Sequence, residues 1–145
     1  MTLRSQLESA ERQLRETREE LDCLKRQTKP RFDLPPRWII KAAKDALGRV
    51  GYWSGALAVL SSYYGVPHMD ARNDPSKVSE KADATYYQYE RTAYFKSTNG
   101  SGVWLVMHEF GHHLNAYLLD KIGGEAEQAF CDAFAFEMQK EWEQV

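Results

Sequence analysis

The chain has 145 residues, a formal net charge of −2 and 43% hydrophobic residues, which is typical of one small globular domain with an additional segment. The slightly negative balance and the lack of a basic patch interleaved with aromatics argue against a nucleic-acid partner. No apolar run approaches the length of about eighteen residues that a membrane span needs, and the N-terminus is highly charged. We therefore expect no membrane partner and no signal peptide.

Residues 1–29 carry a coiled-coil pattern. Leucine or small residues recur at alternating intervals of four and three, between charged and amide residues, at Leu3, Leu7, Ala10, Leu14, Thr17, Leu21 and Leu24. Such a seam over about three heptads predicts a helix that self-associates, and hence a homo-oligomer through residues 1–29. A single amphipathic helix packed on its own domain or on another protein is the alternative, since Ala10 and Thr17 weaken the seam.

Residues 30–37 contain three prolines, which break the helix and predict a linker before a domain at 38–145. From Arg37 to Tyr64 the chain is expected to be helical, with an interruption near residues 48–51 and an end at Gly65. The first piece carries an apolar stripe at Trp38, Ile39, Ala42, Ala43, Ala46 and Leu47. We expect both pieces to be core-forming scaffold helices.

Two segments with different patterns follow. Residues 69–83 are polar and include Asn73-Asp74-Pro75, which predicts a surface loop with at most a short turn of helix. Residues 84–89 and 92–96 are rich in tyrosine, threonine and phenylalanine, which predicts a β-hairpin or a bent pair of strands. One of Tyr86, Tyr87 or Tyr94 is a candidate to face a cleft.

His108-Glu109-Phe110-Gly111-His112 has the pattern His-Glu-x-x-His within an expected helix that stops by Gly123-Gly124. Residues four apart share one face of a helix, so His108 and His112 can present two imidazoles to one zinc ion. Glu109 lies beside the first ligand, where it can accept a proton from a metal-bound water. The motif therefore predicts two metal ligands and a catalytic base within one helical turn.

The order of helix, β-hairpin, His-Glu-x-x-His helix and a second, acidic helix resembles the zincin metallopeptidases, most closely their minimal gluzincin-like versions of the ImmA/IrrE type. The resemblance covers residues 38–145, and its specific parts are the pentapeptide and the acidic helix. It implies an α+β fold, a Zn²⁺ cofactor, and a third ligand from an acidic residue of the last helix. The coiled coil lies outside the resemblance.

The sequence leaves the third ligand open. Asp132-Ala133-Phe134-Ala135 matches the end of the pattern in similar families, but the glutamate sought just before it is replaced by Ala129 and Phe130. Asp132 is favoured because it follows His112 by about twenty residues, as in compact zincins. The alternatives are Glu127, then Glu125, and finally the thiolate of Cys131.

We therefore expect a small zinc-dependent endopeptidase that acts on a protein or peptide substrate and is tethered to an oligomer or larger assembly by its coiled coil. An exposed edge of the predicted hairpin would bind the substrate as an extended strand. Asn115, Tyr117 and Tyr94 are candidates for the cleft, whereas His113 points away from the metal ligands. The alternative is a non-catalytic structural or binding protein that retains a zincin fold, and a cytoplasmic or virion-associated location suits either.

Overall fold

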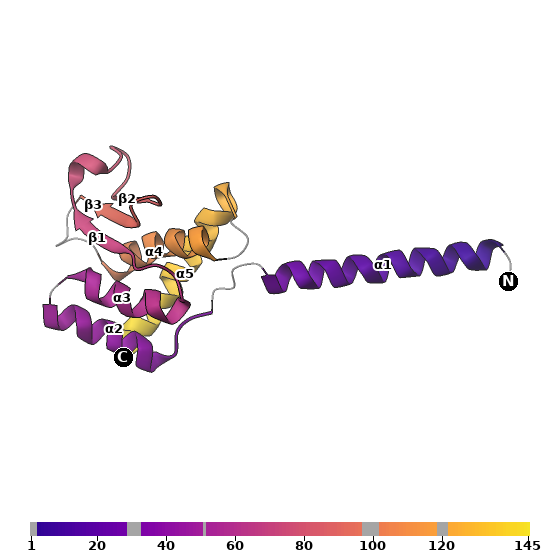
Figure 1. The fold of residues 1–145 in the computed structure, drawn as a ribbon, viewed down its shortest axis with the longest axis horizontal. Coiled ribbons are helices and arrows are strands. Elements are labelled where there is room, and N and C mark those ends of the chain that lie inside the picture. The colour runs from indigo at the N-terminus through magenta and orange to yellow at the C-terminus, as the bar shows by residue number, and fades with distance from the viewer. Residues whose placement is uncertain (1–2, 29–32, 51, 97–101, 119–121) are drawn as a thin grey trace. The chain divides into compact units, whose positions relative to one another are not determined.

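The computed structural model describes residues 3–28, 33–50, 52–96, 102–118 and 122–145, with the side chains of all these except residues 18–28 and 50 (Figure 1). The chain divides into two compact units, residues 1–31 and residues 32–145. The described part of the chain contains no helix long and apolar enough to cross a membrane.

The first unit contains the helix α1, Leu3–Thr28, as the heptad pattern predicts. Among the side chains of α1 that the structure describes, Leu3, Leu7 and Leu14 are 76%, 58% and 63% exposed. Their spacing of four and seven residues places them on one stripe. The helix therefore presents an apolar stripe to which a second helix can bind; the side chains of Leu21 and Leu24, which would extend it, lie outside the described ones.

The second unit has the predicted α+β class. Its elements in chain order are α2 (Arg37–Val50), α3 (Trp53–Tyr64), β1 (Asp70–Asn73), the short 3-10 turn η1 (Pro75–Lys77), β2 (Ala84–Tyr87), β3 (Thr92–Phe95), α4 (Val103–Tyr117) and α5 (Gly124–Gln144). The His-Glu-x-x-His motif lies within α4, and α5 is the predicted acidic helix.

The sheet has three strands in the order β1-β3-β2. The predicted hairpin is confirmed, because β2 and β3 pair antiparallel with Tyr86 opposite Ala93. The prediction of a loop at residues 69–83 is wrong for Asp70–Asn73, which forms β1 and pairs parallel with β3. A polar four-residue strand has no apolar alternation, and its backbone pairing to a distant segment leaves no signal in local sequence.

The interruption between α2 and α3 is confirmed, and Gly65 closes α3 in the left-handed conformation with φ 70°, which glycine adopts without strain. The predicted stripe on α2 is wrong at Trp38, which is 71% exposed. Its other members lie on the covered side: Ala43 is completely buried, and Ile39 and Leu47 pack against the core. Ile40, which the prediction left out, is completely buried as well.

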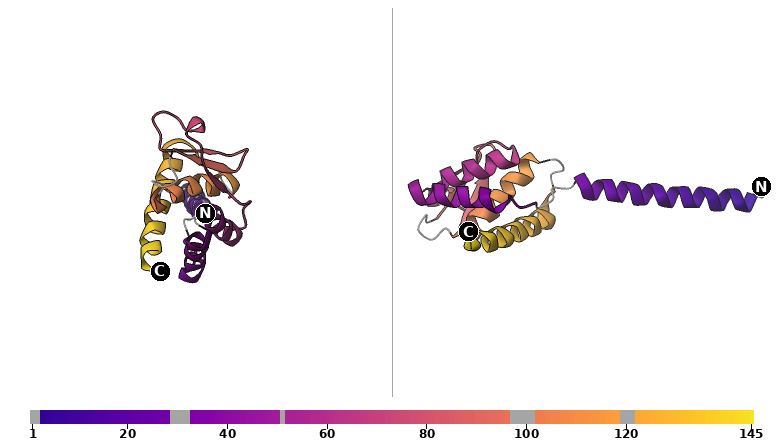
Figure 2. Two further views of the ribbon diagram at one scale, coloured as in Figure 1. Left: turned by 90° about the vertical axis from the view of Figure 1, so that its left-hand side faces the viewer. Right: turned by 90° about the horizontal axis from the view of Figure 1, so that it is seen from below.

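The second unit is layered around α4. Figures 1 and 2 show the sheet on one side of α4 and the pair α2 and α3 on the other, with α5 alongside. Completely buried apolar side chains from these layers meet in one core that includes Ile40, Leu57, Leu60, Ala93, Val106, Met107, Phe110, Phe134 and Met138. The motif helix is thereby fixed by packing on several sides.

The first test concerns the stripe on α1. Replacing Leu7 and Leu14 together by glutamate should abolish self-association, because burial of each leucine contributes roughly 1.5–3 kcal/mol and a buried carboxylate costs more. Deleting residues 1–29 should have the same effect. Sedimentation equilibrium measures the mass, and circular dichroism checks that the remaining domain is folded.

A matched control places the same two negative charges off the stripe, as Ser5→Glu with Ser9→Glu, and should leave the mass unchanged. A wild-type chain that is monomeric at all concentrations would contradict the predicted coiled coil.

Candidate functional site

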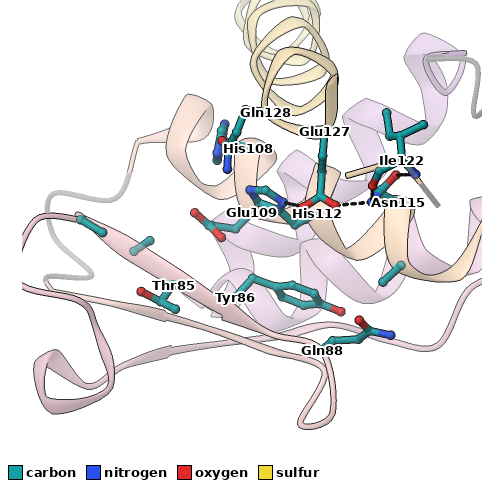
Figure 3. Close-up of a pocket in the computed structure, with 13 residues that line it drawn as sticks. Thr85, Tyr86, Gln88, His108, Glu109, His112, Asn115, Ile122, Glu127 and Gln128 are labelled. Carbon is teal, nitrogen blue, oxygen red and sulfur yellow. Dashed lines mark hydrogen bonds and ion pairs between the residues drawn. The ribbon is translucent and has the colours of Figure 1, made fainter. Parts of the chain in front are cut away.

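A pocket lies between β2, α4 and the start of α5 (Figure 3). The β2 region contributes Ala82, Ala84, Thr85, Tyr86 and Gln88; α4 contributes His108, Glu109, His112, Asn115 and Ala116; and the following segment contributes Ile122, Glu127 and Gln128. The three motif residues that sequence reasoning assigned to chemistry therefore share one pocket. Figure 3 shows the Glu109 carboxylate and the two imidazole rings directed into it.

Glu109 is buried, with only 5% of its surface exposed. Burial raises the pKa of this carboxyl group from 4.5 to about 7 and is the sole cause of the shift, because the charged form loses its hydration. A carboxyl group with a pKa near neutrality exchanges protons readily at physiological pH, which is what a general base or acid needs.

His108 lies beside a carboxylate without a hydrogen bond to it. Its Nδ1 is 2.9 Å from Oδ1 of Asp132, but the two groups are not aligned for a hydrogen bond, and this buried nitrogen has no hydrogen-bond partner among the described residues. Burial and the neighbouring His112 lower the pKa of His108, although Asp132 and Gln128 oppose the change. The ring is therefore held neutral, the form that binds metals.

His112, in contrast, has a short and aligned contact with a carboxylate. Its Nδ1 lies 2.5 Å from Oε2 of Glu127, and the other oxygen of Glu127 accepts a hydrogen bond from Nδ2 of Asn115 at 2.5 Å. Asn115 also donates to the carbonyl of Ile122 and accepts from its amide, at 2.9 and 3.1 Å. This network joins α4 to the start of α5.

His113 is completely buried and belongs to a different network. The carbonyl of Pro67 can only accept, so Nε2 of His113 donates to it at 2.6 Å. Burial lowers the pKa of His113, so the ring is neutral and its Nδ1 accepts from the hydroxyl of Tyr86 at 2.6 Å. His113 thus points away from His108 and His112, as predicted, and holds a tyrosine of the pocket wall.

Gly111 allows α4 and α5 to approach closely. A Cβ at this position would lie 3.1 Å from both Cα and Sγ of Cys131, closer than side chains normally pack. Cys131 is a free, completely buried thiol, and burial raises its pKa. This favours the uncharged thiol over the thiolate that binds metals.

The other predicted residues are distributed around the pocket and beyond it. Glu127 and Asn115 line it, whereas Asp132 is absent from its walls and has a side chain that is 57% exposed. Glu125 is exposed on α5. The ring of Tyr117 lies 5.0 Å from that of His113, and the ring of Tyr94 lies 5.4 Å from that of Tyr87, with neither in the pocket wall.

The donor chemistry of the pocket fits zinc in part. Two imidazole rings and a neighbouring carboxylate are groups of the kind that zinc binds. The buried Nδ1 of His108 has no hydrogen-bond partner among the described residues. Within the described residues, however, no three histidine, cysteine, aspartate or glutamate side chains are already arranged around one metal position. The structure thus brings together the motif and leaves the third ligand between Asp132, which is near His108, and Glu127, which is bonded to His112.

Sequence reasoning did not single out Gln128, and it left the tyrosine of the wall open among Tyr86, Tyr87 and Tyr94. Gln128 lines the pocket and favours the protonated form of His108; its spacing of four residues from Asp132 places both on one face of α5, a signal available in the sequence. Tyr86, and not Tyr94, lies in the wall, because side chains alternate between the two faces of a strand pair and Tyr86 is opposite Ala93.

Comparisons of the chain with protein-family models, with curated proteins and with solved structures gave no match.

The close approach at Gly111 can be tested by Gly111→Ala. The added methyl group meets backbone and Cβ atoms of Cys131, which move only with α5, so we expect a loss of about 1–3 kcal/mol in the free energy of unfolding. Urea denaturation measures it. Gly48→Ala is the matched control, since its Cβ meets nothing within 4 Å and should cost nothing or add up to about 1 kcal/mol. Equal stabilisation by both variants would contradict the close contact.

The raised pKa of Glu109 predicts a pH dependence of stability in EDTA. Its folded-state pKa of about 7 lies above the ordinary 4.5. The protonated Glu109 therefore contributes fully to the free energy of unfolding below pH 4.5, and this contribution is lost as the pH rises through 7. The loss approaches roughly 3 kcal/mol, at 1.36 kcal/mol per pKa unit. Glu109→Gln should remove this decline in urea denaturation between pH 5 and 8.

Glu125→Gln, which changes an exposed carboxylate, should keep the wild-type decline. Parallel curves for wild type and Glu109→Gln would show that Glu109 titrates as an ordinary glutamate.

Proposed function

We propose that this chain is a zinc-dependent endopeptidase. The observation that carries the proposal is the meeting of His108, buried Glu109 and His112 in one pocket that is bordered by the strand β2. Two imidazoles on one helical face and a proton-exchanging carboxylate beside them are the groups that metal-assisted hydrolysis requires.

His108 and His112 would hold the zinc ion, and Asp132 is the favoured third ligand, with Glu127 and then Glu125 as alternatives. When bound by three protein groups, zinc would supply a Lewis acid and would lower the pKa of a bound water towards about 7. His108 is suited to this role because its neutral form is favoured and its buried Nδ1 is without a hydrogen bond to any described residue.

Glu109 is the proposed general base. At neutral pH it is present in both protonation states, because its pKa is about 7. Its carboxylate takes a proton from the attacking water, and its protonated form then gives that proton to the leaving amine. Burial of Glu109 also excludes the bulk water that would otherwise weaken these electrostatic interactions.

The strand β2 provides a place for an extended substrate. It pairs on one side with β3 and ends the sheet order β1-β3-β2, so its other edge carries backbone groups without ladder pairing to any residue that the structure describes. Ala84, Thr85 and Tyr86 of this strand line the pocket together with Glu109. A protein or peptide segment that adds to this edge by backbone hydrogen bonds would pass over the motif residues.

Self-association through the exposed leucine stripe of α1 would make the enzyme an oligomer or attach it to a larger assembly. A non-catalytic binding protein with the same fold is the second candidate. It is favoured by one observation, that no three ligands are arranged for a metal within the described residues.

The proposal is tested by zinc analysis and proteolysis of the purified protein. Wild type and Glu109→Gln should both retain one zinc per chain, measured by mass spectrometry of the metal. Cleavage of a randomised peptide library should fall about 10²–10⁴-fold in Glu109→Gln, the usual loss for a general base. His112→Ala should lose the zinc as well as the activity.

Three results decide between the candidates. Zinc in both proteins with cleavage by wild type supports the peptidase. Zinc in both without any cleavage supports a binding protein in which the metal serves stability. Absence of zinc from the wild type would overturn the peptidase and leave only a binding protein without a metal.

A further inference from the structure

The carboxylate of Glu127 has both of its oxygens in use. Oε2 is 2.5 Å from Nδ1 of His112, and Oε1 accepts from Nδ2 of Asn115 at 2.5 Å (Figure 3). Asn115 is itself fixed by two hydrogen bonds to the backbone of Ile122. Glu127 is therefore held from two sides, with its geometry set before any metal arrives.

This contact determines where the proton of His112 resides. A carboxylate accepts hydrogen bonds, so Nδ1 of His112 is the donor at 2.5 Å. In a neutral imidazole the other nitrogen, Nε2, then carries the free lone pair. A histidine that ligates through one nitrogen commonly donates from the other to a carboxylate, which fixes the tautomer and the orientation of the ring.

Asp132 has a different relation to His108. Its Oδ1 is 2.9 Å from Nδ1 of His108, but no hydrogen bond joins the two groups and the nitrogen stays unpaired among the described residues. The side chain of Asp132 is also 57% exposed, against 27% for Glu127. Of the two carboxylates, Glu127 is thus the one that is hydrogen-bonded to a motif histidine, whereas Asp132 lies near His108 without a hydrogen bond to it.

We propose that Glu127 is a positioning residue, and not a metal ligand: it holds His112 as the Nδ1-protonated tautomer, with Nε2 available to the metal, and Asn115 holds Glu127 in place. The metal part of this inference rests on the proposed function. The tautomer part does not, because it concerns the protein without metal.

The variant Glu127→Met keeps the length of the side chain and removes both acceptors. In the full-length protein in EDTA, long-range ¹H–¹⁵N correlation spectra report which nitrogen of His112 is protonated. Wild type should show Nδ1–H, and Glu127→Met should show a mixture with a substantial Nε2–H fraction. Glu127→Gln, whose amide oxygen can still accept from Nδ1, should restore the wild-type tautomer.

Glu125→Met is the matched control, since Glu125 is an exposed acid in the same first turn of α5, and it should leave the tautomer unchanged. A wild type with Nε2–H on His112, or an unchanged tautomer in Glu127→Met, would overturn the proposal.

Metal binding provides the second readout. Loss of an orienting partner typically weakens metal affinity about 10–100-fold, so Glu127→Met should bind one Co²⁺ per chain with this loss and with the visible ligand-field bands of the wild type. Glu127→Gln should lie between the two. Altered bands or loss of the one-to-one stoichiometry in Glu127→Met would make Glu127 a ligand and overturn the proposal.

The two failures can be told apart. A wild type that binds neither Zn²⁺ nor Co²⁺ overturns the proposed function, while the tautomer spectra still decide whether Glu127 orients His112. A wild type that binds metal and shows Nε2–H in EDTA overturns the positioning role and leaves the proposed function standing.

Discussion

The close approach of α4 and α5 at Gly111 and Cys131 is the constraint on which the pocket depends. Gly111 lies between the two motif histidines, and Cys131 lies between Glu127 and Asp132 along α5. The missing Cβ, which would be 3.1 Å from Cys131, lets each histidine reach a carboxylate of the antiparallel helix, at 2.9 and 2.5 Å. The hydrogen bond between His112 and Glu127 tolerates little change in distance. A wider helix separation would break it and would also move the carboxylate of Asp132 away from His108.

The same helix connects the pocket to the rest of the domain through its other face. Successive residues of a helix differ in direction by about 100°, so His113 points towards the sheet while His112 points towards α5. His113 joins the carbonyl of Pro67 to the hydroxyl of Tyr86, and thereby fixes a wall residue of β2 relative to α4. Two adjacent histidines thus serve two walls of one pocket, and neither could take over the role of the other.

Much of this architecture follows from local sequence, and the remainder depends on distant contacts. Periodicity and turn chemistry identified the helices, the β2–β3 hairpin and the Gly65 cap. They missed β1, which is polar and is held by parallel pairing to β3, and they placed Trp38 in the core although it is 71% exposed. The motif predicted which residues of α4 share a face. Which carboxylate meets which histidine depends on how two helices cross, and side-chain spacing along one helix carries no information about that crossing.

The burial of Glu109 bears on whether the pocket is catalytic or structural. A metal site that serves stability alone needs ligands and no base, and an apolar residue at this position would avoid the cost of burying a carboxyl group. Glu109 is nevertheless buried, with only 5% of its surface exposed, and burial alone raises its pKa to about 7. Perturbed ionisable groups of this kind concentrate at catalytic sites, where activity requires groups that lower the stability of the fold. Glu109, more than the histidines beside it, is therefore the residue that favours an enzyme over a binding protein.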